Sequence, residues 1–126
     1  MGVSIYYTAK RNWPLSAEER AGIKRVVDHY AVEDRIDTYC ATGEGPNWQS
    51  FFVYDPGDPT EPDVVFEGAT GLPNNNEEAF GIGVAHWCAA LSKIRRLIAH
   101  AEWRVHIDDR TIKWDEKRQR FDPYLR

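Results

Sequence analysis

The chain has 126 residues, a formal net charge of −4, and 42% hydrophobic and 29% charged residues. This length fits one domain, and the composition is that of a folded globular protein rather than a disordered or fibrous one. The acidic balance argues against a general nucleic-acid-binding protein, because such proteins use a basic surface to displace counterions from phosphate. We therefore expect a single globular domain over residues 1–126 that does not bind nucleic acid.

The sequence also lacks the signals of a membrane or secreted protein. No apolar run approaches the roughly 18 residues that a membrane-spanning helix needs. The first ten residues, MGVSIYYTAK, show no basic stretch followed by an apolar one. Two cysteines, Cys40 and Cys88, are too few for a disulfide scaffold. We expect a cytoplasmic protein without a membrane partner, in which both thiols are reduced and packed in the core.

Residues 3–31 predict a strand followed by a helix. Alternate residues from Val3 to Tyr7 are apolar, which is the period of a strand with one buried face. Ser16 and Glu19 form the S-x-x-E pattern of a capping box, which marks the start of a helix. Apolar residues then recur at helical spacing, and we expect this helix over residues 16–31.

The middle of the chain predicts a hairpin and an exposed loop. Residues 38–42 and 48–54 are rich in aromatic and β-branched side chains, with a glycine- and proline-containing turn between them. Residues 55–63 contain three prolines and four acidic residues, which predicts a stiff loop on the surface. A further strand is expected over 64–67 and another loop over 68–76.

The strongest helical pattern follows this loop. Asn75 or Asn76 is the expected cap, and acidic residues occupy the first turn. The apolar stripe of this helix is Phe80, Val84, Trp87, Leu91, Ile94 and Ile98. Two strands are expected over 103–107 and 112–114, and the charged tail should dock through Phe121 and Tyr124.

The element order is therefore β-α-β-β-β-α-β-β, which predicts the α+β class. Two helices packed on one face of a mostly antiparallel sheet give the natural closure for such an order. Among the possible arrangements, a split β-α-β topology resembling a ferredoxin-like sandwich is the first choice.

No motif in the sequence specifies an enzyme, a metal site or a cofactor. His86 and Cys88 are two positions apart, so on a helix they point in different directions and do not share an ion. The string from His106 to Asp109 resembles a histidine oriented by a carboxylate, but it also fits a surface histidine beside a turn. We expect no metal and no cofactor.

Two neighbouring surfaces are candidates for binding a protein partner. One is acidic, the other aromatic, and such a combination is typical of a binding hot spot with a charged rim. Consecutive residues of a strand face opposite sides, so at least one of Phe51 and Phe52 should lie outside the core. The predicted partner-binding residues are Glu44, Trp48, Phe51, Phe52, Asp55, Asp58, Glu61 and Asp63, with Tyr54 completing the aromatic set.

Three segments carry a resemblance to known proteins: GVSIYYTAKR, FEGATGLPNNN and AHWCAALSKIRRLI. Together they make the chain similar to small standalone bacterial proteins of unassigned function. Some proteins of this size, acidity and α+β build resemble the immunity partners of bacterial polymorphic toxins. The resemblance implies a protein that neutralises an enzyme by covering it and needs no chemistry of its own.

The first functional hypothesis is therefore a non-enzymatic protein-binding module, of the immunity or inhibitor type, whose partner carries a basic surface. A homodimer is compatible with this hypothesis. The alternative is a small-molecule-binding or enzymatic domain with a pocket near His106, to which Tyr6, Trp103 and Asp108 contribute.

Overall fold

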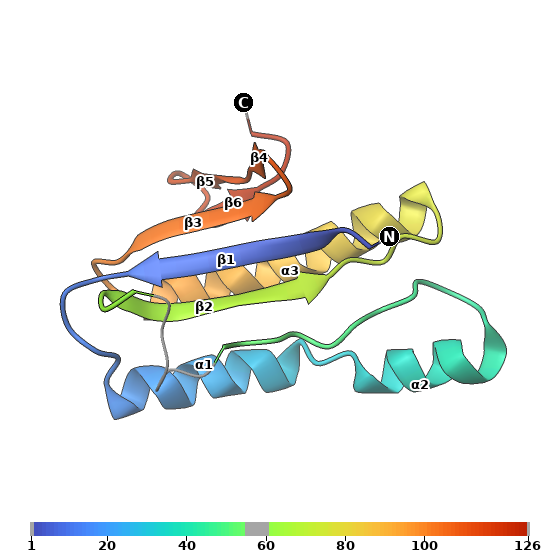
Figure 1. Cartoon of the computed structure of the whole chain (residues 1–126), viewed down its shortest axis with the longest axis horizontal. Helices are drawn as coiled ribbons and strands as arrows, with labels where there is room; N and C mark the ends of the chain where they lie inside the picture. The colour runs from blue at the N-terminus through green and yellow to red at the C-terminus, as the bar shows by residue number, and fades with distance from the viewer. Residues whose placement is uncertain (1, 55–60, 126) are drawn as a thin grey trace.

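The computed structural model of the chain describes residues 2–54 and 61–125. It has the predicted α+β architecture, with helices packed against a mostly antiparallel sheet (Figure 1). In chain order the elements are β1 (Ser4–Lys10), α1 (Ala17–His29), α2 (Glu33–Thr42), β2 (Val64–Gly71), α3 (Glu77–Leu97), β3 (Glu102–Ile107), β4 (Arg110–Thr111), β5 (Lys113–Asp115) and β6 (Arg120–Asp122).

Four strands form an antiparallel sheet in the order β2-β1-β3-β4. Because β2 and β3 both run antiparallel to β1, they are parallel to each other, and α3 connects them around the central strand. Val53 forms a single bridge with Gly68 on the other edge of β2, so its segment runs parallel to β1. These are two interleaved split β-α-β units, the ferredoxin-like pattern, with one strand reduced to a single bridge.

The core lies between one face of this sheet and α3. Figure 1 shows α3 crossing behind the strands, while none of the described helices lies in front of them. The predicted stripe of α3 is confirmed, since Trp87, Leu91 and Ile94 are fully buried and Asn76 caps the helix through its side chain. α1 packs against α3 so closely that a Cβ at Gly22 would lie 3.1 Å from a methyl group of Leu97.

The predicted hairpin over 38–54 is wrong in both of its strands. Residues 38–42 belong to α2, which ends at Gly43 in a left-handed conformation with φ of 71°. The threonines that suggested a strand donate their hydroxyl hydrogen bonds to backbone carbonyls four residues earlier, so the helix satisfies them. Cys40 is consequently exposed rather than packed in the core. Residues 48–54, all of them described, form no strand, and a β-bridge joins Val53 to Gly68.

Two further predictions need correction at the ends of elements. The strand expected over 64–67 continues to Gly71, because its glycines allow close approach to other backbone and side-chain atoms rather than a loop. In the tail, Phe121 docks as predicted, but 80% of Tyr124 is exposed.

The tail forms a small β5-β6 hairpin that is fastened to α3. The guanidinium carbon of Arg95 lies 4.2 Å from the ring centroid of Trp114 and 5.5 Å from that of Phe121. The backbone N–H of Phe121 donates to the Ser92 hydroxyl, which in turn donates to the carbonyl of Cys88. These contacts hold the hairpin along one side of the helix.

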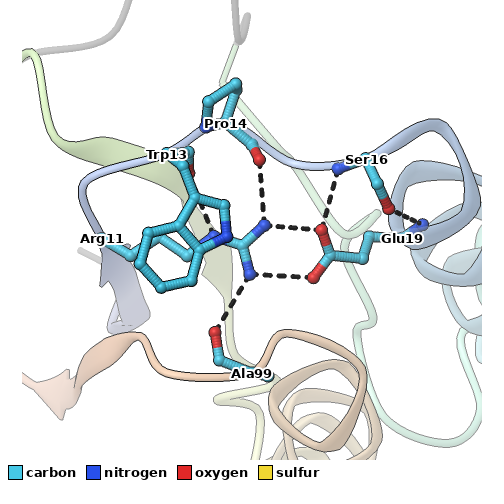
Figure 2. A network of polar contacts seen from close by, with 6 residues as sticks. All are labelled: Arg11, Trp13, Pro14, Ser16, Glu19 and Ala99. Carbon is cyan, nitrogen blue, oxygen red and sulfur yellow. Dashed lines mark hydrogen bonds and ion pairs between the residues drawn. The ribbon is translucent and has the colours of Figure 1, made fainter.

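A buried arginine joins the elements at the other end of the sheet (Figure 2). The side chain of Arg11 is only 2% exposed, and it forms a two-pronged ion pair with Glu19, in which Nη1 lies 2.8 Å from Oε2. Its remaining donors reach the backbone carbonyls of Trp13, Pro14 and Ala99. The same network thus connects the end of β1, the start of α1 and the chain after α3.

Replacement of Trp87 tests the placement of the α3 stripe. Trp87→Ala should lower the free energy of unfolding by about 3–5 kcal/mol, because a fully buried indole is replaced by a cavity. Ile82→Ala is the matched control, since Ile82 is an exposed apolar residue of the same helix. Chemical denaturation measures both variants. Equal stabilities would mean that the stripe does not form the core.

The Arg11–Glu19 pair predicts a specific acid dependence of stability. The Arg11 guanidinium lowers the pKa of Glu19 from its ordinary 4.5 to about 2. The unfolded chain therefore takes up a proton before the folded chain does, and this contribution to stability is lost as the pH falls from about 4.5 to 2.

Glu19→Gln should be less stable than the wild type at pH 7 and should lose less stability over that acidic interval. Glu18→Gln, in the same helical turn, is the control and should keep the wild-type slope. The measurement is the denaturation midpoint of the wild type and of both variants at several pH values between 7 and 2. An unchanged slope in Glu19→Gln would contradict the assignment.

Candidate functional site

The face of the sheet opposite α3 carries the best candidate for a functional surface. Side chains of β1 at Tyr6, Thr8 and Lys10 alternate with the buried ones and therefore point to this side. Their cross-strand partners share the face and are Glu67 and Ala69 on β2, and Glu102, Arg104 and His106 on β3. We call this set, together with Phe52 and Tyr54, the outer sheet face.

Phe52 is held on this face by its backbone. The Tyr7 hydroxyl donates to the Phe52 carbonyl, the Thr70 hydroxyl lies 2.8 Å from the Tyr7 oxygen, and the Phe52 N–H donates to Thr70 Oγ1 over 3.3 Å. Both backbone groups of Phe52 are therefore tied to hydroxyls on the core side of the sheet. Burial raises the pKa of Tyr7, which keeps its hydroxyl protonated and able to donate.

The close fit of this segment depends on Gly68. A Cβ at this position would overlap the Phe52 carbonyl oxygen and the ring of Tyr7. Because Val53 pairs with Gly68 and neighbouring residues alternate, the rings of Phe52 and Tyr54 point away from the core. Their centroids are 5.5 Å apart, in an edge-to-face arrangement, and Phe52 is 58% exposed.

These rings begin a row that crosses the sheet. Phe52 is followed by Ala69, Tyr6 and His106, which are direct cross-strand neighbours. The rings of Tyr6 and His106 are stacked, with centroids 5.1 Å apart and planes inclined by 15°. At the usual strand spacing the row spans about 14 Å. It is a partly apolar strip on the surface of the sheet.

The structure separates the aromatic residues that the sequence grouped together. Phe52 lies outside, as the alternation argument required of one of the two phenylalanines. Phe51 is half-buried and stacks on Tyr7 at 4.8 Å, while Trp48 is 7% exposed and contacts Trp87 edge to face. Trp48 and Phe51 are thus core residues, and their role is to anchor the segment that presents Phe52.

The predicted acidic residues are also dispersed. Glu61 is exposed and forms an ion pair of 2.7 Å with Lys10, which places it at the margin of the outer sheet face. Asp63 is half-buried, and its carbonyl accepts the backbone N–H of Arg11. Glu44 lines a different depression, beside Trp48. Asp55 and Asp58 lie outside the described residues.

The alternative site around His106 is divided by the sheet. His106 and Tyr6 lie on the outer sheet face, and Nδ1 of His106 is 2.8 Å from the carbonyl of Asp108. Trp103 is three positions earlier on the same strand, and its ring contacts Phe66 and Phe121 on the core side. The two groups therefore do not line one pocket.

The remaining candidates for chemistry offer little reactivity. Burial raises the pKa of the Cys88 thiol to about 12, so the thiolate needed for a nucleophile does not form near neutral pH. His86 is bonded to the carbonyl of Tyr30, and burial lowers its pKa. Within residues 2–54 and 61–125, no three His, Cys, Asp or Glu side chains are placed to hold a metal ion. No helix in this part of the chain is long and apolar enough to cross a membrane.

Sequence reasoning missed the polar anchor beneath this surface. The hydroxyls of Tyr7 and Thr70 meet across 63 positions in sequence, and nothing local predicts this pairing. The register of β1 against β2, once known, places Ile5 opposite Thr70 and Tyr7 opposite Gly68, which puts the two hydroxyls within reach. The signal that could have suggested it is the bulk of Tyr7 opposite a glycine.

In comparisons with protein-family models, with curated proteins and with solved structures, no match to this chain is found. The functional argument therefore rests on the geometry of the residues described above.

Removal of the Tyr7 hydroxyl should loosen the segment that carries Phe52. Tyr7→Phe leaves the Phe52 carbonyl without its donor, and we expect a loss of about 1–3 kcal/mol in the free energy of unfolding. The Tyr54 N–H, which donates to the Glu67 carbonyl, should exchange with solvent faster. Hydrogen exchange followed by NMR measures this. Tyr6→Phe is the control, and equal exchange in both variants would contradict the anchor.

Proposed function

We propose that this protein is a non-enzymatic protein-binding module, of the immunity or inhibitor type, which covers a partner with its outer sheet face. The observation that carries the proposal is the exposure of Phe52 on a backbone fixed by Tyr7 and Thr70. An aromatic ring held rigidly in solvent loses little conformational entropy when it is buried by a partner. This favours binding over a purely structural role.

The surroundings of Phe52 suit a protein rather than a small molecule. The row from Phe52 to His106 lies on the open face of the sheet, and charged residues of both signs share this face, including Lys10, Arg104 and Glu102. An apolar centre with a charged, solvated rim is the usual composition of a protein interface. Small molecules instead prefer concave sites that enclose most of their surface.

A site for small-molecule chemistry at His106 has less support. The imidazole has a bonded Nδ1 and a stacked neighbour, which orient it. However, Trp103 lies on the core side of the sheet, and Asp108 belongs to the turn after β3. Tyr6 and His106 are therefore assigned to the interface, where stacked rings offer apolar area and a polar edge.

The product of the neighbouring gene is the first partner to test. Coexpression with this product should yield a complex that is retained at micromolar protein concentration, and an immunity protein should suppress any toxicity of that product. If the product of the neighbouring gene neither copurifies with this protein nor is inhibited by it, the immunity hypothesis is wrong.

Once a complex is in hand, Phe52→Ala should raise its dissociation rate by about 30-fold or more, as expected for a buried aromatic anchor worth about 2 kcal/mol. Stability should hardly change, because the ring is exposed in the free protein. Surface plasmon resonance measures both rate constants. The matched control is Trp13→Ala, an exposed aromatic residue outside this face.

The predicted acidic residues should act on the association rate instead. Changing Asp55, Asp58, Glu61 and Asp63 to amides should slow binding to a basic partner and reduce its dependence on salt. A complex indifferent to both this variant and Phe52→Ala would place the interface on another surface.

A further inference from the structure

A basic groove lies between α3 and the β5-β6 hairpin, on the helix side of the sheet. It has a volume of about 420 Å³, which is within the range of ligand sites in proteins. Four cationic side chains line it against the single carboxylate of Asp122, although the chain as a whole has a net charge of −4. The cationic residues are Lys93, Arg96, Arg118 and Arg120.

The cations on the α3 wall keep donors for a ligand. The ammonium of Lys93 contacts only the ring of Tyr30, at 5.4 Å, within the part of the chain that the structure describes. Arg96 uses its Nε on the carbonyl of Ser92, so its two terminal nitrogens stay available.

The cations on the hairpin wall are only partly neutralised. Arg118 forms an ion pair with Asp115, in which Nη1 lies 3.1 Å from Oδ2. Nη2 of Arg120 lies 3.9 Å from Oδ2 of Asp122, which is beyond hydrogen-bond range. Four like charges in one groove repel one another, and a bound anion would relieve this repulsion.

The groove is not uniformly polar. Ala85 and Ala89 are exposed on the same side of α3, one turn apart, and leave space beside the helix. Three aromatic residues also line it: Tyr30, Phe121 and the largely exposed Tyr124. A ligand that fits must therefore offer apolar groups as well as negative charge.

We propose that this groove binds an acidic peptide segment of a protein partner, in which carboxylates alternate with aliphatic or aromatic side chains. The carboxylates pair with Arg96, Lys93 and Arg120, and the apolar side chains contact Ala85, Ala89 and Tyr30. A nucleic acid fits less well. Its affinity grows with the number of phosphates neutralised, and this groove offers few cations on a chain that is acidic overall. The groove and the outer sheet face are independent surfaces.

The test uses a pooled set of fluorescein-labelled eight-residue peptides in which Asp or Glu alternates with Leu, Val or Phe. Fluorescence anisotropy should show binding to the intact chain in the micromolar range. A pool with Gln in place of the acids, and one with Gly in place of the apolar residues, should both bind more weakly. A labelled single-stranded oligonucleotide of eight nucleotides tests the competing class of ligand.

Two variants locate the site. The double variant Arg96→Glu, Arg120→Glu should weaken peptide binding by at least about ten-fold, because charge-assisted hydrogen bonds are lost and repulsion is added. Arg20→Glu, Arg25→Glu on α1 changes the net charge equally and should keep most of the affinity. Ala89→Trp fills the groove without changing charge and should also weaken peptide binding.

Thermal melts establish that each variant is folded. The proposal is overturned if no acidic pool binds, if the α1 variant loses as much affinity as the groove variant, or if the oligonucleotide binds more tightly at the same salt concentration. Phe52→Ala should leave peptide binding unchanged, so failure here and failure of the proposed function are distinguishable.

Discussion

The guanidinium of Arg11 is a charge withdrawn from water, and the arrangement of the secondary structure depends on how it is satisfied. Removing one partner of such a buried pair typically costs about 3–5 kcal/mol, because an uncompensated charge is left inside. Here the partners come from three parts of the chain: the β1–α1 connection, Glu19 of α1, and Ala99 beyond α3 (Figure 2). This network therefore ties the start of α1 to the end of β1 and to the chain after α3.

That constraint has consequences at the opposite face of the sheet. With α1 held beside α3, both helices serve the same core, and the other face keeps none of the described helices (Figure 1). Such a face would ordinarily be polar in an antiparallel sheet. Here it carries Tyr6, His106 and Phe52 as well, and the last of these is anchored from beneath by buried hydroxyls. The proposal that this face binds a partner rests on these exposed rings.

The sequence patterns were reliable where a helix buries a regular stripe. The stripe of α3 and the capping box of α1 are local features, so no knowledge of distant neighbours was needed to predict them. The strand predicted over 38–42 failed because Tyr39 and its neighbours fit a sheet by propensity, while the acidic first turn and the terminal Gly43 favoured a helix.

The candidate site was predictable only in part, for a related reason. Alternation established that Phe51 and Phe52 face opposite sides, but only the register of β2 shows which of them is outside. The hydroxyl pair of Tyr7 and Thr70 and the groove beside α3 both arise from residues far apart in the sequence. Contacts of this kind follow from tertiary packing, which no local pattern encodes.

The charged residues around the β5-β6 hairpin differ in what they contact. Asp115 is buried in the β5-β6 turn, where it accepts backbone N–H groups from Lys117 and Arg118, and these hydrogen bonds lower its pKa. The guanidinium of Arg95 packs on the rings of Trp114 and Phe121, and this contact holds the hairpin against α3. Ser92 and Phe121, which also join the hairpin to α3, lie in the wall of the groove itself. Arg96, Lys93 and Arg120 also line the groove, and the contacts described above leave each of them donors for a ligand. The acidic segment proposed above is complementary in charge to this cluster.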